Sequence, residues 1–541
     1  MSASALIVAP VAIPLLAGAL SLLAGERRRA LVTGFSLAST LGLLACALAL
    51  LVISDASPTG VAGVLRLGDW PAPFAITLVA DRLSAMMLLL AAILGGAALL
   101  YALAHWSRAG VYFHPLFQFL LTGVNGAFLT GDLFNLFVFF ELLLAASYGL
   151  ALHGSGMGRV KAGLHYVAIN LAASLLFLIG VALIYAVSGT LNMADLAARG
   201  PSLGAQDRTL LEAGAAILGL AFLVKAGMWP LCFWLPATYA SAAPPVAAMF
   251  AIMTKVGAYA LLRLSPLLFG SQAGASSGFG ADVIFVGGVA TIAFGAIGML
   301  AAQDNARLAS HAVIVSAGTL IAAVGVGRVA VTGGALFYLV SSTLGVAAFF
   351  LLVELMQRGR DPGADVFAVT REAYGEEDEP IDEDAQGGPA LPGAMSLIGL
   401  AFIGCAALVA GLPPLSGFLA KVALIGAAFE PTLGNGTNAP ASAWALLVAL
   451  LASGLAALIA LGRAGIQSLW AEERAPPRIR AIEFAPIALL LALTLAQTIY
   501  AGPAMRYMHA AALSLHAPSD YLGESLKPVD DRVTRSRGAA R

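Results

Sequence analysis

Long apolar runs separated by short polar connections dominate the sequence. Each run holds about 20 mainly apolar residues, the length that an α-helix needs to cross the hydrocarbon core of a bilayer. The period-two alternation of a transmembrane β-barrel is absent. The pattern predicts an all-α polytopic membrane protein with about 14 transmembrane helices, at residues 3–23, 31–53, 82–103, 112–130, 132–153, 163–188, 209–236, 243–266, 282–302, 307–327, 331–357, 396–428, 441–462 and 483–503.

Two of these predicted helices are long and contain helix breakers. The seventh has Trp229-Pro230 and Leu235-Pro236, and the twelfth has Gly411-Leu412-Pro413-Pro414. In chain order the seventh and twelfth helices are five apart. Because five is an odd number, equivalent helices would cross the membrane in opposite directions. This is typical of inverted repeats with broken helices near a transport site. We therefore predict two inverted five-helix repeats, with the chain divided into a three-helix segment at 1–110, repeats at 111–266 and 282–462, and a last helix and tail at 463–541.

Composition excludes a soluble enzyme. Hydrophobic residues make up 60% of the 541 positions and charged residues 11%, with a mean hydropathy of +0.89, whereas ordinary globular proteins have roughly 25% charged residues. The net charge of −1 and the lack of a basic patch argue against binding to nucleic acid. Cys46, Cys232 and Cys405 stand alone in apolar runs, so we expect no disulfide, metal site or cofactor.

The basic residues predict the orientation. Connections on one side contain many more arginines than those on the other, so the positive-inside rule makes that side cytoplasmic and puts both termini outside. The first apolar run precedes Arg27, Arg28 and Arg29, the reverse of a cleavable signal, and we retain it as a helix. The connection 358–395 contains an acidic run from Glu376 to Asp384 and is expected to be a solvated cytoplasmic loop.

Four buried charges are the candidates for chemistry. Three of the five lysines, Lys225, Lys255 and Lys421, fall inside predicted helices, while the 24 arginines lie at or near connections. A buried lysine can lose and regain its proton, which an arginine cannot do. Helix rise puts Glu141 and Lys421 roughly 13 Å deep and Lys255 roughly 18 Å deep. Ionisable groups at such depth usually face a cavity or a partner and mark ion pathways, so we predict a proton relay.

Other readings of these residues stay open. The lysines could snorkel to the interface, or Glu141 and Lys225 could form a static ion pair. His311 and Asp132 are weaker candidates for the proton path, since the first could pack a helix and the second could cap one. Glu354, one turn before Arg358, is expected to form an i,i+4 pair with it.

The sequence resembles a known family at several stretches. It is similar to the antiporter-like subunits shared by respiratory complex I and the Mrp multisubunit cation/proton antiporters, over about residues 60–500. Two further stretches look most like the D subunit of the Mrp antiporter. The family stretches are Thr130–Glu141, Lys225–Pro230 and Pro244–Lys255, and those typical of the D subunit are Gly68–Phe74 and Gly411–Phe418.

The resemblance implies both fold and function. It implies fourteen helices with two inverted repeats, Glu141 as the key carboxylate, Lys225 as its partner, Lys255 as the central relay and Lys421 as the terminal lysine. It also implies a proton-translocating subunit of a Na⁺(K⁺)/H⁺ antiporter, a transporter rather than an enzyme, working with other Mrp subunits in a bacterial inner membrane. The alternatives are a proton-pumping subunit of complex I or of a membrane-bound hydrogenase, and a non-transporting membrane scaffold.

The chain departs from its relatives at two points. Cys232 stands where they often have a histidine, and the eleventh predicted helix lacks their histidine and lysine. That helix therefore offers no lysine or histidine to join Lys255 to Lys421. Our hypothesis is that waters held by hydroxyl groups bridge the gap, the candidates being Ser316, Ser341, Ser342 and Thr343.

Overall fold

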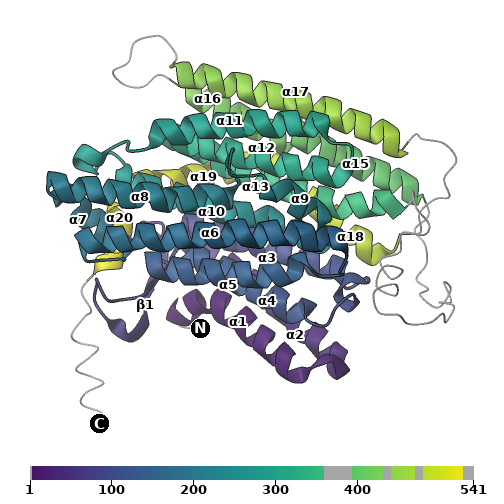
Figure 1. Cartoon of the computed structure of the whole chain (residues 1–541), viewed down its shortest axis with the longest axis horizontal. Coiled ribbons are helices and arrows are strands. Elements are labelled where there is room, and N and C mark those ends of the chain that lie inside the picture. Colours follow the sequence, from purple (N-terminus) through teal and green to yellow (C-terminus); the bar gives the residue numbers. More distant parts are fainter. Residues whose placement is uncertain (1–2, 359–392, 431–439, 470–478, 528–541) are drawn as a thin grey trace.

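A computed structural model describes residues 3–358, 393–430, 440–469 and 479–527 of the chain. The described residues form a bundle of long, roughly aligned helices (Figure 1). The acidic connection expected at 358–395 lies, except at its ends, outside the described residues.

The α-helices make up most of the described chain. Their bounds are α1 Ala3–Ala24, α2 Arg29–Ala56, α3 Arg82–Ala102, α4 Phe113–Leu129, α5 Leu133–Ala151, α6 Met157–Ser188, α7 Met193–Arg199, α8 Ala205–Ala226, α9 Trp234–Ser241, α10 Pro244–Phe269, α11 Ala281–Ala301, α12 Asn305–Val326, α13 Val329–Arg358, α15 Ala394–Ala410, α16 Ser416–Phe429, α17 Ala441–Leu469, α18 Ala481–Ile499, α19 Ala501–His516 and α20 Ser519–Leu526. Short 3₁₀ turns include η1 Glu26–Arg28 and η3 Trp106–Arg108.

Twelve helices in the described part of the chain are long and apolar enough to cross a membrane, by length and composition. Two shorter apolar helices, α15 and α16, come from the predicted twelfth span. The prediction of an all-α, multi-pass membrane protein is therefore confirmed. The count of fourteen and the inverted repeats stay predictions.

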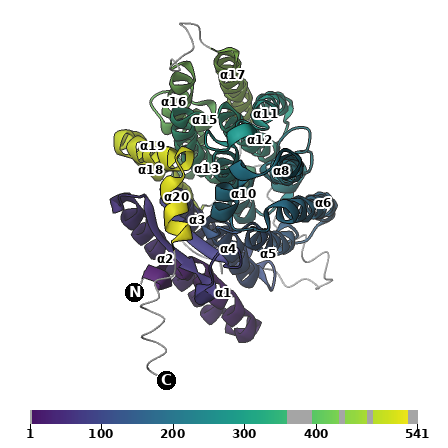
Figure 2. The same ribbon diagram turned by 90° about the vertical axis from the view of Figure 1, so that its left-hand side faces the viewer.

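Burial separates central helices from peripheral ones. The most apolar window of α10 is 100% buried, and those of α13 and α12 are 89% and 83% buried. The corresponding windows of α1, α2, α6 and α17 are only 39% buried, so most of their apolar side chains face lipid or neighbouring proteins. Seen from its end, the bundle has α10 and α13 at its centre and α1 and α17 at opposite edges (Figure 2). Polar groups in the middle of α10 and α13, such as Lys255 and Ser341, are therefore enclosed by protein.

The two predicted helix breaks are both present. The first separates α8 from α9 and the second separates α15 from α16. Each first half ends at a glycine in the left-handed region, Gly227 (φ 78°) and Gly411 (φ 76°). Just beyond each glycine, a backbone N–H reaches five residues back, from Met228 to the Leu223 carbonyl at 3.0 Å and from Leu412 to the Ala407 carbonyl at 2.8 Å. This is the Schellman ending of a helix, and it leaves both breaks with the same local geometry.

An unpredicted β-hairpin covers one end of the bundle. Strand β1 (Val61–Arg66) pairs antiparallel with β2 (Thr77–Asp81). Isolated bridges join Leu78 to Thr130 and Asp132 to Asn192, so the hairpin is tied to the connections before α5 and α7. Helix α20 lies across this same end (Figure 2). These ties fix where α5, the helix that carries Glu141, enters the bundle.

Candidate functional site

The first half of the site joins three helices through a serine. Glu141 lies on α5, Ser174 on α6 and Lys225 on α8. The Ser174 hydroxyl donates a short hydrogen bond to Glu141 Oε1, and Lys225 Nζ donates to Ser174 Oγ at 3.3 Å. In the described part of the chain, the two charged groups thus meet through this hydroxyl and form no direct ion pair. We call these three residues the serine-bridged pair.

Aromatic side chains surround the serine-bridged pair. Lys225 Nζ lies 5.2 Å from the centre of the Phe140 ring. Phe140 in turn contacts Phe177 and Phe222, which contact each other edge-on. Lys225 is only 5% exposed. A buried ammonium needs compensation, and here the ring face and the serine-bound carboxylate supply it.

The fold also places Lys225 at a helix terminus. Lys225 lies in the last turn of α8, one residue before that helix ends at Ala226. The carbonyls at the C-terminus of a helix carry partial negative charge, which stabilises a nearby cation. The Gly227 break therefore creates this electrostatic environment in the middle of the bundle, where a continuous helix would have none.

Lys255 is placed differently. It lies on the central helix α10, is 2% exposed, and makes one hydrogen bond, from Nζ to the neighbouring Thr254 Oγ1 at 3.5 Å. Among the described residues no carboxylate lies within ion-pair distance of its ammonium. A lysine with so little compensation is poorly suited to a static structural role.

Lys421 occupies the second helix break. It lies on α16 and is 8% exposed. Its Nζ donates a hydrogen bond of 2.8 Å to the carbonyl of Ala410, the last residue of α15. The ammonium therefore lies against the negative end of a broken helix, as Lys225 does at the first break. The snorkelling alternative does not describe any of the three lysines, because all three ammonium groups are enclosed.

Hydroxyl groups occupy the region between the central helices and α16. Ser316 on α12 and Ser342 on α13 share a hydrogen bond of 2.9 Å, and Ser341 and Ser416 share one of 2.7 Å. A small cavity of about 20 Å³ touches Ser316, Ser341, Ser342 and Tyr338. A polar cavity of this size can hold one water molecule. Thr343 instead donates to the Leu339 carbonyl of its own helix at 2.5 Å.

The structure does not connect the two weaker candidates to the lysines. His311 contacts the Arg307 carbonyl of its own helix through Nδ1 at 2.9 Å and packs against Phe294. Asp132 caps α5 by accepting a hydrogen bond from the Asn135 amide at 2.8 Å. Both contacts fit the structural alternatives given above, helix packing and helix capping.

Sequence reasoning missed a buried ionic cluster at the end of α13. Glu354 and Arg358 form the expected i,i+4 pair, at 2.5 Å. Arg358 also contacts Glu483 at 2.8 Å, and His105 lies 3.1 Å from Glu354 and 3.7 Å from Glu483. Tyr101 and Trp106 donate to Glu354 at 2.8 and 2.9 Å. We call this group the α13 cluster; the residues come from segments too distant in sequence for their spacing to reveal it.

A second missed pair lies at the opposite end. Arg263 on α10, expected near a connection, is 6% exposed and makes a bidentate contact with Asp81 at the end of β2. Burial alone would raise the pKa of Asp81, but the Arg263 guanidinium and the Ser84 hydrogen bonds outweigh it and lower that pKa. The pair fastens the β-hairpin to the central helix.

No metal centre is found among the described residues, where no three His, Cys, Asp or Glu side chains group together. The three cysteines are free and buried. The site thus consists of lysines, one carboxylate and hydroxyls. Such groups can bind, orient and transfer protons.

Known proteins that are similar to this chain share one family and one fold. The family described as "NADH:quinone oxidoreductase/Mrp antiporter, TM" matches residues 130–446. The D subunit of a "Probable K(+)/H(+) antiporter" from Rhizobium meliloti is 56% identical, covering 95% of this chain and 96% of its own. The D subunit of a "Na(+)/H(+) antiporter" from Alkalihalophilus pseudofirmus is 35% identical, covering 96% and 99%.

Solved structures give the same picture. A chain of the Mrp complex from Dietzia sp. superposes with a TM-score of 0.80 at 26% identity, covering 97% of this chain and 100% of that one. A chain of respiratory complex I from Thermus thermophilus has a TM-score of 0.71 at 22% identity, covering 96% and 100%. The second likeness shows a shared fold alone.

Proposed function

Because the chain belongs to the NADH:quinone oxidoreductase/Mrp antiporter family of membrane subunits, we propose that it is the D subunit of a multisubunit monovalent cation/proton antiporter. In this function it moves protons inward while the complex exports Na⁺ or K⁺. Its partners are the other subunits of that complex. The two relatives named above are the D subunits of a K⁺/H⁺ and of a Na⁺/H⁺ antiporter by name, which supports this assignment.

The serine-bridged pair is the observation that carries the proposal. While Glu141 is ionised, it stabilises the Lys225 ammonium through the Ser174 hydroxyl. Protonation of Glu141 removes that stabilisation, and the charge on Lys225 then becomes costly among the surrounding phenylalanine rings. Lys225 responds by releasing its proton. A proton arriving at Glu141 is thereby converted into a proton leaving Lys225.

Lys255 and Lys421 continue the path in this proposal. Lys255, which has no carboxylate partner among the described residues, accepts and passes the proton at the centre of the bundle. The hydroxyls of Ser316, Ser341 and Ser342, with a water in their cavity, lead toward Lys421. Lys421 holds the proton against the end of α15 before release. His311 and Asp132 have supporting roles at most, given their local contacts.

The orientation belongs to the same proposal. Arg27 and Arg28 lie in the α1–α2 turn and Arg29 begins α2, at the end of the bundle where α3 joins α4. By the positive-inside rule this end faces the cytoplasm of a bacterial inner membrane and both termini lie outside.

The test is proton exchange in inverted membrane vesicles that contain the whole complex, with added K⁺ or Na⁺. A Lys255→Arg variant keeps the charge but cannot release a proton. We expect it to abolish cation-dependent dissipation of the pH gradient. The control is Lys161→Arg at the exposed start of α6, which should show the same proton exchange as the wild type. Wild-type exchange by Lys255→Arg would refute the assignment of Lys255.

A further inference from the structure

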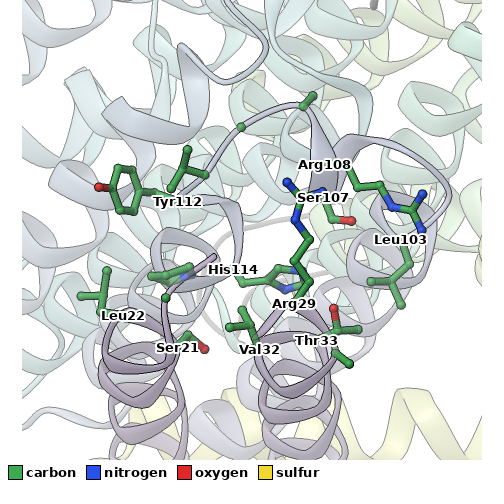
Figure 3. A pocket seen from close by; sticks show the side chains of 16 residues that line it. Ser21, Leu22, Arg29, Val32, Thr33, Leu103, Ser107, Arg108, Tyr112 and His114 are labelled. Atoms are coloured by element: carbon green, nitrogen blue, oxygen red, sulfur yellow. The ribbon is translucent and has the colours of Figure 1, made fainter. Parts of the chain in front are cut away.

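A large pocket is lined by none of the three residues of the serine-bridged pair. It has a volume of about 1090 Å³ and opens between the α1–α2 turn and the connection from α3 to α4. Figure 3 shows Arg29 rising from α2 toward the connection that carries Ser107 and Arg108. Pockets for small ligands commonly have volumes of roughly 300–1,000 Å³, so this one can admit a sizeable group.

Two guanidinium groups give the pocket its charge. Arg29 and Arg108 both line it and both are exposed. No described side chain forms an ion pair or hydrogen bond with either one. In sequence, Glu26 is the only acidic residue in the two connections that border the pocket. Toward the described side chains, both arginines therefore present unpaired, forked donors, a geometry that suits phosphate.

The rest of the lining is largely apolar. Leu22, Val32, Leu103 and Val111 lie around the arginines. Leu22 belongs to α1 and Val32 to α2, two helices whose apolar side chains are mostly unburied. The pocket thus begins at the level where the transmembrane helices end and continues toward the hydrocarbon. This combination of apolar walls below and positive charge above matches the boundary between an acyl chain and a headgroup.

We propose that this pocket binds the phosphodiester headgroup of an anionic phospholipid from the leaflet at this end of the bundle. Arg29 and Arg108 hold the phosphate, and the Ser107 hydroxyl lies where it can add a hydrogen bond. The glycerol and upper acyl chains lie along Leu22 and Leu103. Basic pockets between transmembrane helices are known to bind acidic lipid headgroups. A free anion such as inorganic phosphate would gain nothing from the apolar walls.

The bound lipid would link two parts of the fold. His114 at the floor of the pocket contacts Ser36 Oγ through Nδ1 at 3.0 Å, which joins α4 to α2. Arg29 belongs to α2, and Arg108 belongs to η3 just before α4. A phosphate held by both would strengthen this junction. The lipid would therefore stabilise the N-terminal helices without entering the proton path.

The test uses the purified antiporter complex in its whole form. Native mass spectrometry counts retained lipid, and thermal unfolding is followed with added phosphatidylglycerol, phosphatidylcholine or inorganic phosphate. We expect phosphatidylglycerol alone to be retained and to stabilise the wild type. The Arg29→Gln/Arg108→Gln variant should bind phosphatidylglycerol roughly tenfold or more weakly, since both basic contacts to the phosphate are lost.

Matched variants make the result specific. Arg27→Gln/Arg28→Gln removes the same charge from the same turn but outside the pocket, and should retain the lipid. Normal melting of Arg29→Gln/Arg108→Gln in phosphatidylcholine would show that it folds. Equal losses in both double variants, equal binding of phosphatidylcholine, or protection by phosphate alone would overturn the proposal. So would crosslinking of Ser107→Cys to another subunit, because a protein would then fill the pocket.

Discussion

At the scale of single residues, the Ser174 hydroxyl determines how Glu141 and Lys225 influence each other. It is the only described group that hydrogen-bonds to both. A hydroxyl can donate to a carboxylate and accept from an ammonium at once. The connection is therefore directional, and it depends on one oxygen atom.

Removing the Ser174 hydroxyl should weaken proton exchange. Ser174→Ala removes a hydrogen bond to a charged group, which is worth about 1.5–3 kcal/mol. We expect cation-dependent proton exchange to fall roughly 10- to 100-fold, with little change in the amount of folded complex. The matched control is Ser188→Ala on the same helix, whose hydroxyl donates only to backbone carbonyls. Unchanged exchange in Ser174→Ala would exclude the bridge.

The sequence predicted the charged residues of the site and missed the neutral one. Ionisable side chains in a transmembrane helix stand out because their insertion is costly. A serine in such a helix usually bonds to its own backbone, as Ser188 does. Ser174 looks the same in sequence, and only the packing of α6 against α5 and α8 distinguishes it. Lys421 was predicted to be buried, but its carbonyl partner depended on the geometry of the break.

At the scale of elements, the two broken helices create the charged environments that Lys225 and Lys421 occupy. Prolines in the sequence predicted both breaks. The left-handed glycine and the five-residue backbone hydrogen bond at each break came only from the structure. Hydropathy did not reveal the β-hairpin, because it lies outside the apolar runs.

Gly411 offers a test of the second break. A Cβ there would lie 2.8–3.0 Å from the Lys421 side chain, and the φ of +76° disfavours any L-residue by about 1–2 kcal/mol. Gly411→Ala should therefore displace Lys421 and reduce proton exchange severalfold. A Cβ at Gly426, on α16 with Lys421, would have nothing within 4 Å, so Gly426→Ala should have no effect. Equal exchange in both variants would show that the placement of Lys421 is unimportant.

The α13 cluster is expected to contribute stability. Removing one partner of a buried ion pair lowers the free energy of unfolding by about 3–5 kcal/mol. We expect the loss in Glu354→Ala to lie near the lower end of this range, because Arg358 is 31% exposed. A lowered melting temperature of the purified complex would show this. Glu524→Ala breaks an exposed pair with Lys527 and serves as the control. Similar melting of both variants would mean that the cluster contributes little.

At the scale of the whole molecule, the positions of both ends of the bundle test the orientation. The native cysteines are buried, so a single introduced cysteine can be labelled selectively. Gln303→Cys lies at the exposed α11–α12 turn, and Ser519→Cys lies at the start of α20. In intact cells a membrane-impermeant thiol reagent should label Ser519→Cys and leave Gln303→Cys unlabelled. The reverse pattern would place both termini in the cytoplasm.

In the proposed function, Glu141 is the first group of the proton path. The most direct measurement is K⁺- or Na⁺-dependent dissipation of the pH gradient in inverted vesicles containing the complete complex with Glu141→Gln. We expect exchange to fall to background while assembly is retained, and we expect normal exchange from Glu212→Gln, in the second turn of α8. Wild-type exchange by a fully assembled Glu141→Gln complex would contradict the account.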